Sequence, residues 1–362
     1  MIRNNDIKKI LLVTGGTGGH IYPALSIYKY LENKSYKVKI LTDKRGLKNE
    51  NLVRHNPYVI NVKGFAGKKN SEKAIASLLV LFSTIKAVLL LRKEKFTLVL
   101  SFGSYVQVPV LLAAKILKIS YILHEANAVI GKANKMFWRF AKVRTSFYKL
   151  KVSDFKTKQI GMPVRSEIEG LYKHNYIVPK KNKKIKILIM GGSLGSEALS
   201  YNFSTKLCKL PCHLKKRLSI IHQVKSYQLK EVVSIYDNNN IKAKVKTFIN
   251  DIDKTLKTTS LIICRAGAST IAENLIAGIP AIYIPINASS NEHQYFNALK
   301  ISRQKLGWLF KETEIGSEKF IKFLNNLLNS ESILKSYSIN CKKAAFPCAS
   351  KSLYEIVAGF ND

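Results

Sequence analysis

A buried strand followed by a glycine-rich turn occupies residues 9–25, KILLVTGGTGGHIYPAL. Residues 9–14 form an apolar run typical of a parallel strand, and the turn GGTGGH follows at residues 15–20. Pro23 suits the first turn of a helix, where the missing N–H costs no hydrogen bond. Because strand, glycine turn and helix begin a βαβ unit, the sequence predicts a doubly wound α/β fold.

The same pattern returns half a chain later. Residues 184–190, KIKILIM, are followed by GGSLGS at residues 191–196 and by the helix-like EALSYNFSTKL. Two such starts predict two α/β domains. We expect residues 1–163 and 164–340 to form these domains, with the break at GMPV, and a C-terminal helix in 341–362 to pack back on the first domain.

Further short apolar runs alternate with helical stretches, which is the rhythm of parallel sheets. The predicted strands are Tyr36 to Thr42, Leu98 to Ser101, Tyr121 to His124, Lys158 to Ile160, Ser219 to Gln223, Leu261 to Cys264 and Ala281 to Pro285. The predicted helices include Val110 to Leu117 and Ile271 to Ala277.

The chain is strongly basic. Its 362 residues carry 60 Lys and Arg against 23 Asp and Glu, a net charge of +37. With 46% hydrophobic residues it can bury a core, which excludes a disordered basic tail. Residues 1–165 hold a net +23 and residues 166–362 a net +14. A nucleic acid, an anionic membrane or substrate, and a composition rich in surface lysine remain as explanations.

Two features bear on where the protein resides. Five cysteines, an odd number, and an N-terminus that runs into a strand fit a reducing cytoplasm without a signal peptide. Residues 75–91 are apolar but short for a bilayer span, and they contain Lys86. This segment is either a core helix or an amphipathic helix whose outer face touches a bilayer.

Glycine-rich turns bring backbone N–H groups close to phosphates. GGTGGH lacks both the dinucleotide fingerprint and the Lys-Ser/Thr of a P-loop, so neither NAD nor ATP is indicated. Residues 264–274, CRAGASTIAEN, are more informative, because a helix is expected to begin there at Ala268 or Ser269. The N–H groups of Ala268, Ser269 and Thr270 suit a diphosphate, and Glu273 suits the two hydroxyls of a ribose.

Seven motifs in order resemble the MurG family of peptidoglycan UDP-N-acetylglucosamine transferases. They are GGTGGH, HEANAVIGKANK at 124–135, GMPVR at 161–165, GGSLGS, FINDI at 248–252, CRAGASTIAE and NEHQYFNA at 291–298. The resemblance implies a GT-B fold, with two Rossmann-like domains facing a cleft. The first would take a lipid-linked acceptor and the second the UDP-sugar.

The resemblance also implies a set of donor-binding residues. Ile249 would contact uracil, Glu273 the ribose, and Ser193, Ala268, Ser269 and Thr270 the diphosphate. Arg165 would add a charge, and Gln294 would bind sugar hydroxyls. From the first domain, Thr17, Gly18 and Gly19 would close over the donor, and Asn127 would reach the N-acetylglucosamine.

An acceptor hydroxyl must lose a proton as it attacks, so a base is expected at the site. His20 stands on the glycine loop and is the first candidate, with a structural histidine as the alternative. Glu125 is the second candidate, unless it only orients the HEAN turn. Asp251 and Asp253 imitate a DxD metal pair, but we assign them to the surface and expect no metal and no cofactor.

Several positions depart from the family pattern. Ser104 follows Gly103 where a second glycine is expected, which affects an N–H arrangement for the acceptor diphosphate. Met162, Leu194 and His293 also replace usual residues, and they affect fine donor contacts.

The function that the resemblance implies is inverting transfer of N-acetylglucosamine from UDP to the C4 hydroxyl of a muramyl-pentapeptide on a polyprenyl diphosphate, lipid I to lipid II, in peptidoglycan synthesis. The implied location is peripheral, on the cytoplasmic face of an anionic membrane, without nucleic acid. A GT-B enzyme that glycosylates diacylglycerol and a basic nucleic-acid-binding protein are the alternatives. Protein partners cannot be read from the sequence.

Overall fold

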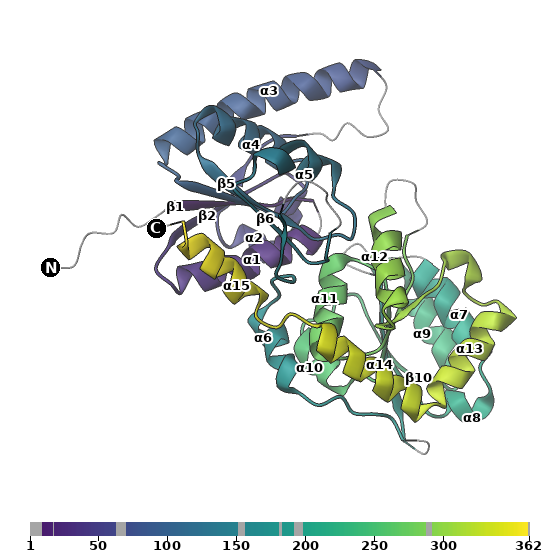
Figure 1. Cartoon of the computed structure of the whole chain (residues 1–362). Helices are drawn as coiled ribbons and strands as arrows, with labels where there is room; N and C mark the ends of the chain where they lie inside the picture. Colours follow the sequence, from purple (N-terminus) through teal and green to yellow (C-terminus); the bar gives the residue numbers. More distant parts are fainter. Residues whose placement is uncertain are drawn as a thin grey trace. The chain divides into compact units, whose positions relative to one another are not determined.

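The protein is described here by a computed structural model that covers residues 9–16, 18–62, 70–150, 156–180, 183–191, 198–286 and 292–360. It divides into two compact units, Met1–Arg165 with Cys348–Asp362 and Ser166–Pro347 (Figure 1). The chain therefore returns to the first unit at Cys348, whereas the boundary expected after residue 340 falls inside helix α14 (Glu331–Ala344).

The first unit contains a seven-stranded sheet in the order β3-β2-β1-β4-β5-β6-β7, with every neighbouring pair parallel. Its strands are β1 (Lys9–Val13), β2 (Lys37–Thr42), β3 (Tyr58–Val59), β4 (Leu98–Ser101), β5 (Ser120–Glu125), β6 (Val143–Ser146) and β7 (Lys158–Gln159). Strand order reverses beside β1, where glycine-loop sites form in such sheets.

Helices cover both faces of this sheet. They are α1 (Gly18–Glu32), α2 (Glu50–Val53), α3 (Asn70–Lys93), α4 (Gln107–Ile116), α5 (Lys132–Phe137) and α15 (Ala349–Ala358). Leu11 and Val13 of β1 share a buried cluster with α3, α4 and α5. Ile10 and Leu12 point to the other face and pack with α1 and α15. The C-terminal helix thus completes one core of the first unit.

Helix α1 begins earlier than the position of Pro23 suggests. It starts at Gly18, so Pro23 lies inside the helix rather than in its first turn. The second half of GGTGGH is therefore already helical. The ring nitrogen of Pro23 cannot donate to the carbonyl of Gly19, and the helix accepts this loss because its apolar face is buried.

The second unit contains a six-stranded parallel sheet in the order β10-β9-β8-β11-β12-β13. Its strands are β8 (Ile185–Met190), β9 (Leu218–Gln223), β10 (Lys242–Lys246), β11 (Leu261–Cys264), β12 (Ala281–Tyr283) and β13 (Trp308–Leu309). The surrounding α-helices are α6 (Ser166–Glu169), α7 (Phe203–Leu207), α8 (Cys212–Lys215), α9 (Leu229–Asn238), α10 (Ile252–Thr258), α11 (Ala268–Ala277), α12 (Glu292–Arg303), α13 (Glu318–Leu328) and α14. A π-helix (Ala198–Asn202) precedes α7.

Lys342 of α14 ties three segments of the second unit together. Its Nζ donates to the carbonyls of Leu171 (2.6 Å), Tyr172 (2.7 Å) and Ile276 (2.8 Å), the last near the C-terminus of α11. We expect Lys342→Met to lower the free energy of unfolding by about 1–3 kcal/mol, because three carbonyls lose a charged donor. Denaturant unfolding measures this, with Lys343→Met, an exposed neighbour, as control. Equal stabilities of the two variants would contradict the role.

We expect the buried His222 to make the second unit sensitive to acid. It is fully buried, with Nδ1 2.8 Å from the Tyr236 hydroxyl and Nε2 2.7 Å from the Leu199 carbonyl. Burial lowers the pKa of His222 to about 4, against the bond to Leu199, which raises it. The unfolded chain binds this proton below about pH 6.5 and the folded one does not, so stability falls as the pH drops.

We expect this histidine to contribute a loss of up to about 3 kcal/mol between pH 6.5 and 4. His222→Gln removes the titration, so its stability should fall less steeply over that range, although it starts lower at pH 7.5. Chemical denaturation at a series of pH values gives both slopes. Parallel slopes would show that the proton uptake lies elsewhere.

Candidate functional site

Helix α11 presents one narrow polar face at the carboxyl end of β11. Seven of its ten residues are buried, and the three that are not are Ser269, Thr270 and Glu273. These three lie on one side of the helix because they are spaced by three and four residues. Three of the residues that the sequence assigned to the donor thus share the accessible face of α11, whereas Ala268, a fourth, is buried at the start of the helix.

The N-terminus of α11 offers backbone donors beside this face. The first intrahelical bond runs from the Ile271 N–H to the Gly267 carbonyl at 3.0 Å. The N–H groups of Ala268, Ser269 and Thr270 precede that bond and point out of the start of the helix. Together with the helix dipole they suit an anionic ligand, and Glu273 lies one turn further along.

Arg265, which the sequence analysis did not single out, braces the loops around α11. It is buried, donates from Nη1 to the carbonyls of Ile284 (3.0 Å) and Pro285 (3.2 Å), and forms an ion pair with Glu312. The next residue, Ile286, donates its N–H to Gln294 Oε1 at 3.3 Å. The sequence signal for this role of Arg265 was an arginine directly after a buried strand.

The remaining donor candidates of the second unit are less clearly gathered. Ile249 is buried, beside the exposed Phe248. Ser193 and Leu194 lie outside the described residues. His293 keeps Nδ1 buried without a hydrogen-bond partner among the described residues. Asp251, the first residue of the DxD pair, is exposed as expected, with Lys254 Nζ 3.9 Å from its Oδ1.

His20 is held with a defined tautomer in the first unit. Its Nδ1 lies 2.7 Å from the carbonyl oxygen of Phe102. A carbonyl only accepts, so Nδ1 carries the proton, and in the neutral ring the lone pair is on Nε2. Burial, and to a smaller extent the charge of His20, lowers the pKa of the neighbouring His124 to about 3, so His124 stays neutral.

Glu125 is the centre of a buried hydrogen-bond network. Its Oε1 accepts from the N–H and the Nδ2 of Asn127 (2.9 and 3.1 Å). Its Oε2 accepts from the N–H of Gly131 (2.9 Å) and from Asn134 Nδ2 (2.8 Å). Asn134 Oδ1 in turn accepts from Gln107 Nε2 at 2.9 Å. With four donors on its carboxylate, Glu125 orders the loop after β5, including Asn127.

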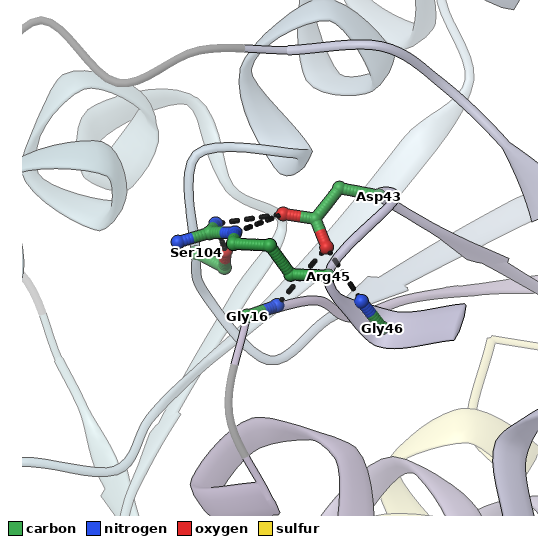
Figure 2. Close-up of polar contacts among 5 residues, drawn as sticks. All are labelled: Gly16, Asp43, Arg45, Gly46 and Ser104. Carbon is green, nitrogen blue, oxygen red and sulfur yellow. Dashed lines mark hydrogen bonds and ion pairs between the residues drawn. The ribbon is translucent and has the colours of Figure 1, made fainter. Parts of the chain in front are cut away.

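The other candidates of the first unit lie around the N-terminal end of α1. Gly18 is buried and Gly19 is half-buried in the first turn, whereas Thr17 lies outside the described residues. The Arg165 guanidinium stands 5.1 Å from the ring centroid of Tyr22, also on α1. Gly16 has φ +80°, and its N–H donates to Asp43 at 3.2 Å, a contact the sequence did not suggest (Figure 2).

Among the described residues, no three His, Cys, Asp or Glu side chains are placed as a set that could hold a metal ion. The polar groups gathered at α11 are backbone N–H donors, two hydroxyls and one carboxylate. This set of groups fits a nucleoside diphosphate, whose negative charge is stabilised by the positive end of the helix dipole.

Each unit matches one half of a glycosyltransferase. Residues 10–145 match the glycosyltransferase family 28 N-terminal domain, and residues 186–353 match its C-terminal domain. The crystal structure of the calicheamicin glycosyltransferase CalG4 shares the fold, with a TM-score of 0.67 at 10% identity over 98% of this chain and 99% of that one. The two parallel α/β domains are those of a GT-B glycosyltransferase.

Closer relatives narrow the class. A crystal structure of MurG from Acinetobacter baumannii is 27% identical, with a TM-score of 0.79 over 97% of this chain and 99% of that one. The UDP-N-acetylglucosamine–N-acetylmuramyl-(pentapeptide) pyrophosphoryl-undecaprenol N-acetylglucosamine transferases of Rickettsia bellii and Anaplasma marginale are 34% and 32% identical, over 93% and 98% of this chain and 95% and 99% of their own. The chain belongs to the MurG family.

Proposed function

We propose that the protein transfers N-acetylglucosamine from UDP to the C4 hydroxyl of a muramyl-pentapeptide carried on a polyprenyl diphosphate, which converts lipid I to lipid II. The observation that carries this is the near full-length similarity to transferases of that name, at 30–34% identity. The accessible face of α11 supports it, because its donors and Glu273 suit a nucleoside diphosphate.

The donor is assigned to the second unit. Glu273 binds the ribose hydroxyls, the N-terminus of α11 binds the diphosphate, and the backbone of Ile249 contacts uracil. Gln294, fixed by its bond to the Ile286 N–H, binds the sugar hydroxyls. Ser193 completes the diphosphate site in the second unit, and Arg165, Thr17, Gly18, Gly19 and Asn127 are the proposed contributions of the first unit.

His20 is assigned as the base. Its Nε2 takes the proton of the C4 hydroxyl while that oxygen bonds to the anomeric carbon. The bond from this carbon to the β-phosphate oxygen breaks, and its electron pair leaves with UDP, so a single displacement inverts the carbon. The N-terminus of α11 stabilises the charge that develops on the leaving group. Glu125, the second candidate, is assigned to ordering its loop, because four donors already surround it.

Helix α3 supports a peripheral position on a membrane, and the cytoplasmic face is the side that the family resemblance implies. Of the described helices, its segment Ile75–Lys93 alone is long and apolar enough for a span, a weak criterion by itself. Its inner face is buried with α4, through Ala87 and Leu91 among others. Its outer face holds Ile75, Leu78, Leu81, Phe82, Ile85 and Leu89, each 51–62% exposed. One buried and one exposed apolar face suit a helix lying on a bilayer beside basic ends.

We expect Phe82→Glu with Leu89→Glu to reduce binding to anionic vesicles at least about tenfold, because two apolar side chains no longer enter the bilayer. Flotation on phosphatidylglycerol vesicles measures this. A variant with glutamine at two exposed lysines of the second unit, Lys230 and Lys244, lowers the net charge by the same two units and serves as the charge control. Equal losses of vesicle binding in both variants would show that net charge, rather than the apolar face of α3, drives the binding.

The choice of acceptor tests the function itself. Labelled UDP-N-acetylglucosamine is offered with equal amounts of lipid-linked muramyl-pentapeptide and diacylglycerol in the same vesicles. The proposal predicts label in the muramyl lipid. Label in diacylglycerol would favour the glycolipid alternative, and label in neither, with intact protein, would refute both.

A further inference from the structure

An arginine and a buried aspartate meet beside the glycine loop that follows β1 (Figure 2). Asp43 follows β2 and is 2% exposed. Its Oδ2 accepts from Arg45 Nε (2.9 Å) and Nη2 (2.6 Å), and its Oδ1 accepts from the N–H groups of Gly16 (3.2 Å) and Gly46 (3.0 Å). The carboxylate therefore fixes the guanidinium against the backbone of the loop.

Arg45 is only partly used by these contacts. Its side chain is 62% exposed, and Nη2 also lies 3.5 Å from Ser104 Oγ. A guanidinium has five N–H donors, and the two on Nη1 make no hydrogen bond to any other described residue. An exposed, pre-oriented guanidinium edge of this kind suits a phosphate oxygen. The Gly16 backbone lies close to the guanidinium, since a Cβ there would lie 3.6 Å from Nη2.

The same short loop contacts Arg45 and His20. Phe102 offers its carbonyl to His20 Nδ1, and Ser104, two residues on, contacts Arg45. Gly103 and Ser104 both have positive φ (+94° and +70°), and a Cβ on Gly103 would lie 3.3 Å from His20 Cε1. The turn thus contacts both the candidate base and the guanidinium.

We propose that Arg45, oriented by Asp43, binds a phosphate oxygen of the acceptor's diphosphate. This rests on the proposed function, in which the acceptor carries its diphosphate on C1 and its reacting hydroxyl on C4, at opposite ends of one sugar ring. A phosphate bound at Arg45 would orient the sugar ring so that the C4 hydroxyl faces His20. Arg45 is a substrate-binding residue in this account, and Asp43 is a positioning residue.

Four proteins test the proposal: wild type, Arg45→Ala, Asp43→Asn and Lys44→Ala. In Asp43→Asn the new amide oxygen can still accept from Gly16 and Gly46, but the amide N–H groups face the guanidinium and release it. Lys44 is exposed, and Lys44→Ala removes the same charge as Arg45→Ala. Binding of farnesyl diphosphate, a soluble polyprenyl diphosphate, is measured by calorimetry without any transfer chemistry. KM and kcat for the muramyl lipid and for UDP-N-acetylglucosamine are measured alongside.

We expect Arg45→Ala to weaken farnesyl diphosphate binding and to raise the acceptor KM at least about tenfold, with the donor KM within about twofold of wild type. Lys44→Ala should resemble wild type. Asp43→Asn is the most discriminating variant, because it removes one negative charge next to the guanidinium. General attraction predicts tighter diphosphate binding by Asp43→Asn, whereas lost orientation of Arg45 predicts weaker binding.

Unchanged or tighter binding by Asp43→Asn, or equal effects of Arg45→Ala and Lys44→Ala, would overturn the proposal. Absence of transfer by the wild type would instead refute the proposed function, and farnesyl diphosphate binding would still decide on Arg45. Thermal unfolding of each variant excludes misfolding as the cause.

Discussion

His20→Ala is expected to lower kcat for N-acetylglucosamine transfer by about 10²–10⁴-fold, because a positioned general base contributes that much. The KM values for both substrates should change little, since the imidazole accepts a proton in the transition state and does not bind a charged group of either substrate. The geometry behind this is the 2.7 Å contact between Nδ1 and the Phe102 carbonyl, which puts the proton of the neutral ring on Nδ1 and the basic lone pair on Nε2. Steady-state kinetics with each substrate varied in turn measures the split.

His20→Asn separates catalysis from structure. An asparagine can still donate to the Phe102 carbonyl, so the helix start should keep its stability, but it offers no basic nitrogen. We expect its kcat to stay as low as that of His20→Ala while thermal unfolding returns toward wild type. Recovery of kcat along with stability would make His20 a structural residue and return Glu125 to consideration as the base.

Glu273→Ala is expected to weaken UDP binding about 100-fold, because two hydroxyls lose a charged acceptor. The residue is one of the three on α11 that are not buried, so its loss should leave the core intact. Calorimetry with UDP measures the affinity, and Glu273→Gln, which keeps one acceptor oxygen, should lie between wild type and Glu273→Ala.

The matched control compares nucleotides that differ only in sugar hydroxyls. 2′-Deoxy-UDP should lose affinity for wild type and show a smaller loss for Glu273→Ala, since the lost partners are the same. A stronger effect of Glu273→Ala on kcat than on UDP affinity, together with a KM effect of His20→Ala, would reverse the two assigned roles.

Local pattern was enough to predict much of the sheet. The strands Leu98–Ser101 and Leu261–Cys264 occur with the predicted bounds, because each is a short, largely apolar run that follows a polar residue. Helix α11 begins at Ala268, one of the two starts expected. The glycine turns and Glu273 were visible for the same reason, since their chemistry depends on neighbours in sequence.

The contacts that the sequence did not reveal depend on how strands and helices pack together. The Asp43 and Arg45 pair lies beside Gly16 only because β1 and β2 are adjacent. Glu125 is surrounded by donors because α5 packs beneath the loop after β5, and Gln107 reaches it through Asn134. The helix start predicted from Pro23 was wrong, because tertiary packing of α1 outweighed the local preference of proline for the first turn.

The reaction product tests the account most directly. The purified protein is incubated with UDP-N-acetylglucosamine, whose sugar is α-linked, and lipid-linked muramyl-pentapeptide, and the product is examined by mass spectrometry and NMR. We expect one added N-acetylglucosamine, β-linked to the C4 oxygen of the muramyl residue. An unchanged acceptor in the presence of folded protein, or an α-linked product, would refute the proposed function.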